Sequence, residues 1–197
     1  NFSHQFSPKK TWTADADFVS YKYDNPSDYD IQNVNADGSL GESSKLRVSK
    51  ETPIELMVAK TDYVHQFGKE NSFEAGLKAA RSLFDNDVRV ESQEQDVWTP
   101  DPSLTSRFKL NEDVLAAYAS LGLKLNPKTD VKFGLRYEFT NTNLGSVEQP
   151  NVVDRQYGRF FPSLFIARKL TDDQQLNFSY SRRIWRPGFT QLAPYLI

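Results

Sequence analysis

The most constraining pattern in this sequence is an alternation of apolar and polar residues with a period of two. It is cleanest over Asp130 to Thr140, where large apolar residues hold the odd positions and charged residues, glycine or threonine hold the even ones. Successive side chains of a β-strand point to opposite faces, so this segment is predicted to be a strand with one apolar and one charged face. The run Asn177 to Arg183 alternates in the same way, until Arg186-Pro187-Gly188 ends it.

Comparable alternation predicts about seven strands, preceded by a strand remnant at Phe2 to Phe6. The seven are Lys10–Tyr23, Ser43–Gln66, Ser72–Phe84, Leu104–Leu125, Asp130–Thr140, Gln156–Lys169 and Gln175–Trp185. Pro53 indicates an irregularity in the second strand, and Val114 to Ser120 is apolar enough to form a helical turn or two instead. The predicted fold is all-β, an antiparallel up-and-down meander.

Short and long connections alternate strictly between these strands. Each short connection sets about five polar residues between two large apolar ones, as tight hairpins do. The short connections are Phe6–Trp12, Phe67–Phe73, Leu125–Val131 and Leu170–Leu176, and the long polar stretches are Asp24–Glu42, Asp85–Ser103 and Asn141–Asp154. In an up-and-down sheet, all the tight turns then share one end. Outer-membrane barrels have this asymmetry, with short periplasmic turns and long external loops.

Composition excludes several classes of function. The chain has 24 Lys and Arg against 26 Asp and Glu, and this lack of a basic excess argues against a nucleic-acid partner. It has no cysteine, which excludes disulfides and thiolate chemistry. No run approaches the roughly 20 apolar residues of a membrane helix, whereas a strand of a membrane barrel needs only about 10 alternating residues.

The alternation itself fits two environments. In water the aromatic face would be the core, whereas in a membrane it would meet lipid and the charged face would line a polar lumen. The segregated turns favour the membrane. So do aromatic residues beside the turns, which resemble an interfacial girdle, namely Phe6, Trp12, Phe67 and Phe73. The alternative is a soluble antiparallel β-domain that binds a ligand or partner protein on its sheet.

One run within this pattern resembles a known family. Phe178-Ser179-Tyr180-Ser181-Arg182-Arg183-Ile184-Trp185-Arg186-Pro187 is similar to a run in outer-membrane β-barrel proteins related to the TonB-dependent receptors of Gram-negative bacteria. Glu112–Ala119, Phe133–Glu138 and Phe160–Leu164 resemble the same family, whose best match covers Leu104 to Ile197. The resemblance implies a large barrel in the cell outer membrane, with about 22 strands in the transporter type. It also implies uptake of a nutrient such as a metal chelate or a glycan.

Family members draw energy from an inner-membrane protein through a plug domain, and no part of this chain looks like a plug. Residues 1–197 are therefore interpreted as a single segment of a barrel wall. An odd strand count and a broken start do not describe a closed barrel, and exposed strand edges invite pairing with another chain. The expected partners are outer-membrane lipid, a nutrient ligand, the energy-coupling protein through a plug outside this segment, and a second copy of the segment bound edge to edge.

No constellation of residues predicts catalysis or a cofactor, and the chain is not expected to be an enzyme. Its two histidines, His4 and His65, are isolated in the sequence, so neither a Ser-His-Asp arrangement nor a zinc site is expected. Asp15 and Asp17 share a strand face, as paired catalytic carboxylates do. Cross-strand charge pairing explains them more simply, because the same face of neighbouring strands is expected to carry Lys60, Lys78 and Arg136.

Two acidic loop tips are weak candidates for binding a cation. The candidate ligands are Asn33, Asn35 and Asp37 in the first tip, and Asp85 and Asp87 in the second. The first tip follows the opening of a calcium-loop pattern that ends in Gly38, but Ser44 stands where the closing Glu belongs and Glu42 would have to reach instead. A polar external loop with an Asp-Gly turn is the simpler interpretation.

A basic cluster near the end of the chain supplies weak ligand-binding candidates. Arg182, Arg183 and Arg186 would suit an anionic ligand or a lipid phosphate, and Trp185 would stack on a sugar. The alternative is that these arginines pair with carboxylates in the lumen and at its rim, with Trp185 at the membrane interface.

Overall fold

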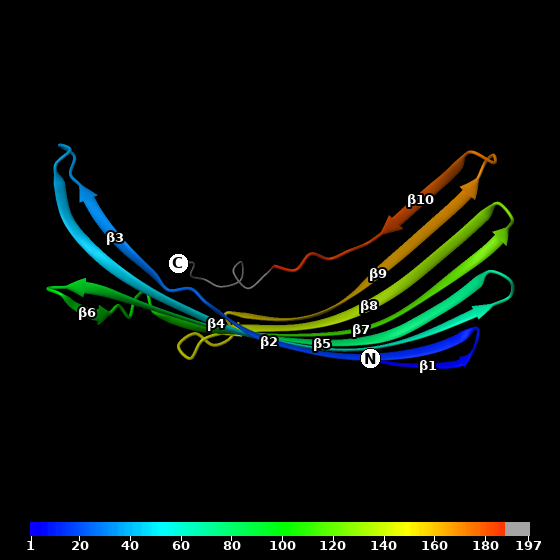
Figure 1. The fold of residues 1–197 in the computed structure, drawn as a ribbon, viewed down its shortest axis with the longest axis horizontal. Coiled ribbons are helices and arrows are strands. Elements are labelled where there is room, and N and C mark those ends of the chain that lie inside the picture. The colour runs from blue at the N-terminus through cyan, green and yellow to red at the C-terminus, as the bar shows by residue number, and fades with distance from the viewer. Residues whose placement is uncertain (188–197) are drawn as a thin grey trace.

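A computed structural model describes residues 1–187, which form one antiparallel β-sheet of ten strands (Figure 1). The strands are β1 (Phe2–Ser7), β2 (Lys10–Asp24), β3 (Ser27–Val34), β4 (Leu40–Phe67), β5 (Asn71–Glu94), β6 (Val97–Pro100), β7 (Ser106–Asn126), β8 (Thr129–Gly145), β9 (Val153–Lys169) and β10 (Gln175–Ser181). Their order across the sheet is β1-β2-β4-β5-β7-β8-β9-β10, with β3 on β4 and β6 on β5. The predicted all-β antiparallel meander is confirmed. Within residues 1–187 no helix is long and apolar enough to cross a membrane.

The eight strands of the main path correspond to the seven predicted strands and the remnant before them. Val114 to Ser120 lies inside β7, so the helical alternative is wrong. The irregularity expected at Pro53 is confined to one ladder. Pro53 pairs in register with Lys22 of β2, whereas the β4–β5 ladder omits it, as a residue without an N–H requires on one side.

All four tight turns lie at one end of the sheet, on the right in Figure 1, as the alternation of connections predicts. They join β1 to β2, β4 to β5, β7 to β8 and β9 to β10. The other ends of the strands extend much further than predicted. β4 runs for 28 residues, which at roughly 3.3 Å per residue is about 90 Å.

The prediction that the long polar stretches are loops is wrong for much of their length. β3 forms inside the first stretch, β5 and β6 form a hairpin in the second, and β8 continues to Gly145 in the third. Arg47 of β4 links the two hairpins, because its Nε donates to Asp28 of β3 at 3.1 Å and its guanidinium lies 4.2 Å from the ring centroid of Trp98 in β6.

The sheet is strongly curved, and residues 182–187, which follow β10, run back inside the curve (Figure 1). In this segment Arg186 contacts Glu138 and Thr140 of β8, so those side chains mark the concave, inner face. Directly opposed residues on neighbouring strands point to the same side. One row of the inner face therefore consists of Asp15, Lys60, Lys78, Ala116, Glu138 and Arg159.

Candidate functional site

The outer face of the sheet is apolar in the half near the tight turns. On β8 the side chains of Phe133, Leu135, Tyr137 and Phe139 are 37–49% exposed, and residues 1–187 place no second layer over them (Figure 1). The hydroxyl of Thr61 on this face is internally satisfied. It accepts from Trp12 Nε1 at 2.6 Å and donates to the backbone carbonyl of Thr13 at 3.0 Å. Such internal pairing is what contact with lipid demands.

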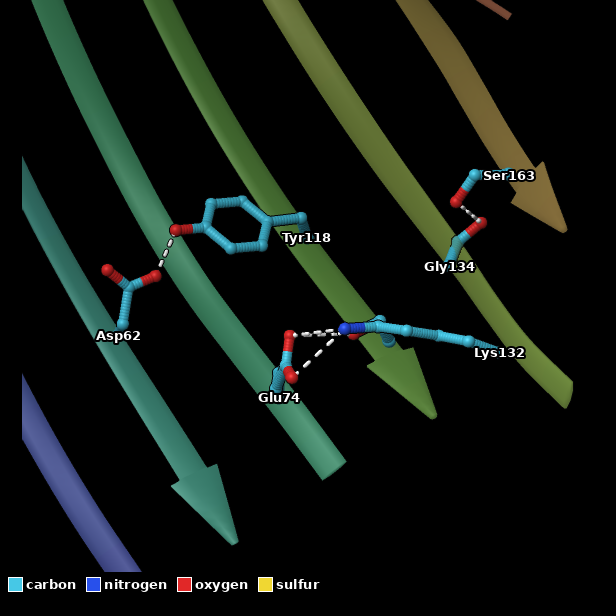
Figure 2. A network of polar contacts seen from close by, with 7 residues as sticks. Asp62, Glu74, Tyr118, Lys132, Gly134 and Ser163 are labelled. Atoms are coloured by element: carbon cyan, nitrogen blue, oxygen red, sulfur yellow. Dashed lines mark hydrogen bonds and ion pairs between the residues drawn. The ribbon is translucent and has the colours of Figure 1, made fainter. Parts of the chain in front are cut away.

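The inner face of the same half carries a network of charged and hydroxyl groups (Figure 2). Tyr118 of β7 donates to Asp62 of β4, and Lys60 Nζ lies 2.9 Å from the same carboxylate. Nearer the turns, Lys132 Nζ lies 3.0 Å from both oxygens of Glu74. The two faces therefore differ as the lipid side and the lumen side of a barrel wall do.

Gly76 of β5 makes the contact between Tyr118 and Asp62 possible. The register places Gly76 directly between them, and Figure 2 shows the tyrosine reaching over β5. A Cβ at this position would lie 2.5 Å from the phenol oxygen and 2.6 Å from Asp62 Oδ1. Sequence reasoning missed this site, although a lone glycine inside a strand is a signal that another group approaches the backbone closely.

A second cluster is centred on Glu138, whose side chain is only 12% exposed. Arg136 Nε and Arg186 Nη2 each donate to Glu138 at 2.5 Å, and Arg186 also donates to Thr140 Oγ1 at 3.1 Å. The Arg136 guanidinium lies 5.3 Å from the ring centroid of Tyr118. The two clusters thus form one polar track along the inner face.

The residues predicted from the basic cluster are not brought together. Arg186 reaches into the inner face, where it is paired with a carboxylate. The backbone N–H of Arg182 donates to the carbonyl of Pro162 at 3.1 Å, and the side chains of Arg182 and Arg183 are exposed. Trp185 is 75% exposed. A ligand-binding role for these four residues remains a prediction.

The first candidate cation tip is an internally bonded turn, and the second is not a loop tip, because Asp85 and Asp87 lie within β5. Asp37 Oδ1 accepts from the backbone N–H and hydroxyl of Ser39 at 3.0 and 2.6 Å, in a turn where Gly38 has φ of 83°. Asn33 lies in β3, and the Asn35 amide donates to Ser39 Oγ at 2.9 Å. Within residues 1–187, no group of three or more His, Cys, Asp or Glu side chains could hold a metal ion.

His65 and Asp15, the other residues considered for catalysis, also have structural neighbours. His65 lies between Tyr63 and Phe67, with ring centroids 6.4 and 5.9 Å away. Asp15 stands opposite Lys60 in the β2–β4 register, so the predicted sharing of a face by these opposite charges is confirmed.

The two faces exchange character where the strands leave the apolar band. On β5 the outer face changes from Leu77 and Ala79 to Arg81, while the inner face changes from Lys78 to Phe84. The buried clusters of the far half all lie on the inner face and comprise Val48, Val88 and Val90, and Phe108, Leu110 and Leu144. Beyond the exchange, the sheet has the polarity of a wall with water outside and an apolar core within.

The row at this exchange marks the end of the apolar band on the outer face. Arg81 and Asp113 pair there at 3.3 Å, and Asn141 and Gln156 follow on the same row. On β8 the apolar band below it runs from Val131 to Phe139. That length matches the roughly 9–11 residues of a strand that crosses a membrane.

Beyond the band, an ion pair makes the stability of the wall depend on pH. Arg107 Nε and Nη2 donate to Asp85 at 2.8 and 2.7 Å. These hydrogen bonds, and then the charges of Arg107 and Lys109, hold the pKa of the Asp85 carboxyl below its usual value against the opposing effect of burial. A lowered folded-state pKa stabilises the fold above the pKa of the unfolded chain, and that stability is lost as pH falls through the folded-state pKa.

We therefore expect Asp85→Asn to lower the free energy of unfolding by about 1 kcal/mol at pH 7, where the pair is intact. The difference between the wild type and this variant should shrink toward zero at pH 2. Urea titrations of the intact protein at both pH values measure it. A difference that is the same at both pH values would show that the charge of Asp85 does not contribute.

A comparison with protein families places these features in context. The model of a family described as "Outer membrane protein beta-barrel family" matches residues 4–197. A comparison with curated proteins found none that matches the chain. The family match covers nearly the whole sequence and agrees with a curved sheet that has a lipid side and a lumen side. The chain belongs to the outer membrane protein beta-barrel family and is located in the outer membrane.

Proposed function

We propose that this wall belongs to a transporter related to the TonB-dependent receptors, which takes up a nutrient such as a metal chelate or a glycan. The observation that carries the proposal is the polar track on the inner face, from Lys60 and Asp62 through Tyr118 to Arg136 and Glu138. A polar inner face of this kind suits a lumen through which hydrophilic cargo passes. The resemblance of Phe178 to Pro187 to receptor-related barrels supports the same function.

The composition of the track suits hydrophilic cargo. Arg136 and Lys60 present cations, Tyr118 presents an aromatic ring with a hydroxyl, and Ser120 donates to Glu74 at 3.2 Å. Metal chelates and glycans both offer oxygen acceptors, which such donors bind. In the outer membrane the aromatic face contacts lipid and is not the core of a soluble domain. The location therefore argues against the alternative of a soluble β-domain. We propose that energy coupling acts through a plug outside residues 1–197, and that the wall has no catalytic role.

The experiment that tests this proposal is uptake by cells that produce the intact protein. Replacing Arg136 and Glu138 together by glutamine removes one positive and one negative charge and leaves the net charge unchanged, so we expect uptake to fall by about tenfold at unchanged surface abundance. Arg89→Gln is the matched control, because Arg89 lies on the outer face beyond the band, and it should leave uptake unchanged.

Deletion of the inner-membrane energy-coupling protein should abolish uptake by the wild type. Uptake that persists without this protein would contradict the proposal and would indicate a passive pore. Uptake that the double variant leaves unchanged would show that the inner-face track does not contact the cargo.

A further inference from the structure

The outer face contains a groove within its apolar band. The floor is one row of three alanines on adjacent strands, in which Ala16 stands opposite Ala59 and Ala59 opposite Ala79. Larger side chains border this row, namely Phe18, Met57, Leu77, Leu115 and Phe139. Because alanine ends at Cβ, the row lies one side chain deeper than its borders. Two overlapping hollows of about 690 Å³ each share Ala59 and Ala79 and form the groove.

The upper end of the groove reaches the boundary of the bilayer. Arg81, Asp113 and Asn141 line this end, and they belong to the row at which the two faces exchange character. Arg81 contacts Asp113 through Nε at 3.3 Å, and its side chain is 56% exposed, so its terminal amino groups are open to a further anion. The groove therefore begins with a cation at headgroup level and descends into the hydrocarbon.

The orientation of the wall identifies the leaflet. The short turns of outer-membrane barrels lie on the periplasmic side, and Arg81 lies on β5 on the far side of the apolar band from its turn at Phe67–Asn71. The groove therefore opens toward the outer leaflet. An acyl chain suits its alanine floor, and a phosphate suits Arg81 as a charge-assisted hydrogen-bond acceptor.

We propose that this groove, floored by Ala16, Ala59 and Ala79, is a binding site for an acyl chain of a phosphorylated glycolipid of the outer leaflet, whose phosphate binds Arg81. The site lies on the opposite face from the transport track and does not depend on the cargo. A lipid bound here differs from the general layer of lipid around the barrel, because the groove holds its acyl chain and Arg81 holds its phosphate.

Native mass spectrometry of the intact protein in mild detergent, with added diphosphoryl lipid A, tests the proposal. Filling the groove with Ala59→Phe and Ala79→Phe should reduce the lipid-bound fraction by about tenfold, since the acyl chain loses its contact area. Ala119→Phe is the matched control. Ala119 is also exposed on the outer face, outside the groove, and this variant should bind lipid A as the wild type does.

Arg81→Gln separates the headgroup from the chain. It should weaken binding of diphosphoryl lipid A by about tenfold and leave binding of the dephosphorylated lipid unchanged. Equal lipid binding by the groove-filled variant and the wild type would overturn the proposal. So would loss of a protein dimer, rather than of lipid, on filling the groove, because the groove would then be a contact between two copies.

Discussion

Replacing Leu135 by arginine is expected to lower the free energy of unfolding from a bilayer by about 2–4 kcal/mol, the cost of a cation at the membrane midplane of a barrel. Leu135 lies halfway along the apolar band of β8 and is 49% exposed on the outer face. In water, an exposed leucine replaced by arginine changes stability by no more than about 0.5 kcal/mol. A loss of about 2–4 kcal/mol would therefore show that Leu135 contacts lipid.

Leu176→Arg provides the matched control for this prediction. Leu176 is 59% exposed on the same face, but it lies beside the turn and pairs in register with Arg168. An arginine near the interface costs only about 0–1 kcal/mol. Denaturant titrations of both variants of the intact protein in vesicles give the two values. Equal costs below about 1 kcal/mol would show that Leu135 does not face hydrocarbon.

The second large effect is expected at Gly76. A valine there would place its Cβ against the Tyr118 phenol and Asp62, since even an alanine Cβ would lie 2.5 and 2.6 Å from them. Displacing the tyrosine removes its hydrogen bond and strains the inner face, so Gly76→Val should destabilise the protein by about 2–4 kcal/mol. Ala75→Val, one residue away on the outer face, should change stability by less than about 0.5 kcal/mol.

A double-variant cycle identifies the cause of this effect. If the valine acts by meeting the tyrosine, Tyr118→Ala should recover much of the loss in the Gly76→Val background, with a coupling energy of about 1–3 kcal/mol. Additive costs would show that Gly76 matters for the backbone alone. Tyr118→Phe should cost only about 1 kcal/mol, because it removes the hydrogen bond and keeps the ring.

The sequence predicts those parts of the fold in which one face is apolar and the other polar. β8 is the clearest example, because lipid on one side and water on the other impose an alternation from Val131 to Phe139. Where the faces exchange character, apolar residues occur on both faces, as in Val114-Leu115-Ala116-Ala117 of β7. The alternation vanishes there, which is why this stretch also suggested a helix.

Beyond the exchange of the two faces, the sequence pattern predicts loops where the structure has strands. The far halves of the strands carry Asp85, Asp87 and Arg107 toward water, so these segments look like polar loops in the sequence. Their apolar partners on the inner face, such as Val88 and Val90, reveal strands only when the phase of the pattern is allowed to shift by one residue. The long connections were therefore predicted at the correct end but with the wrong structure.

The contacts that form the polar track could not be predicted from the sequences of the individual strands. Tyr118 and Asp62 are 56 residues apart, and Arg186 and Glu138 are 48 residues apart. Each contact depends on the register of intervening strands, which the local pattern does not specify. The charge alternation did predict correctly that Asp15, Lys60, Lys78 and Arg136 share one face, because each residue's face follows from its own strand.

The central claim is that the outer face of the band meets lipid and the inner face meets water. The chain has no cysteine, so single cysteines at positions 133 to 138 of β8 in the intact protein can carry a spin label without background. In vesicles, labels at 133, 135 and 137 should be accessible to oxygen dissolved in the bilayer, and labels at 134, 136 and 138 to a water-soluble nickel complex. Accessibility to the nickel complex at the odd positions, or no alternation between the two sets, would contradict the account.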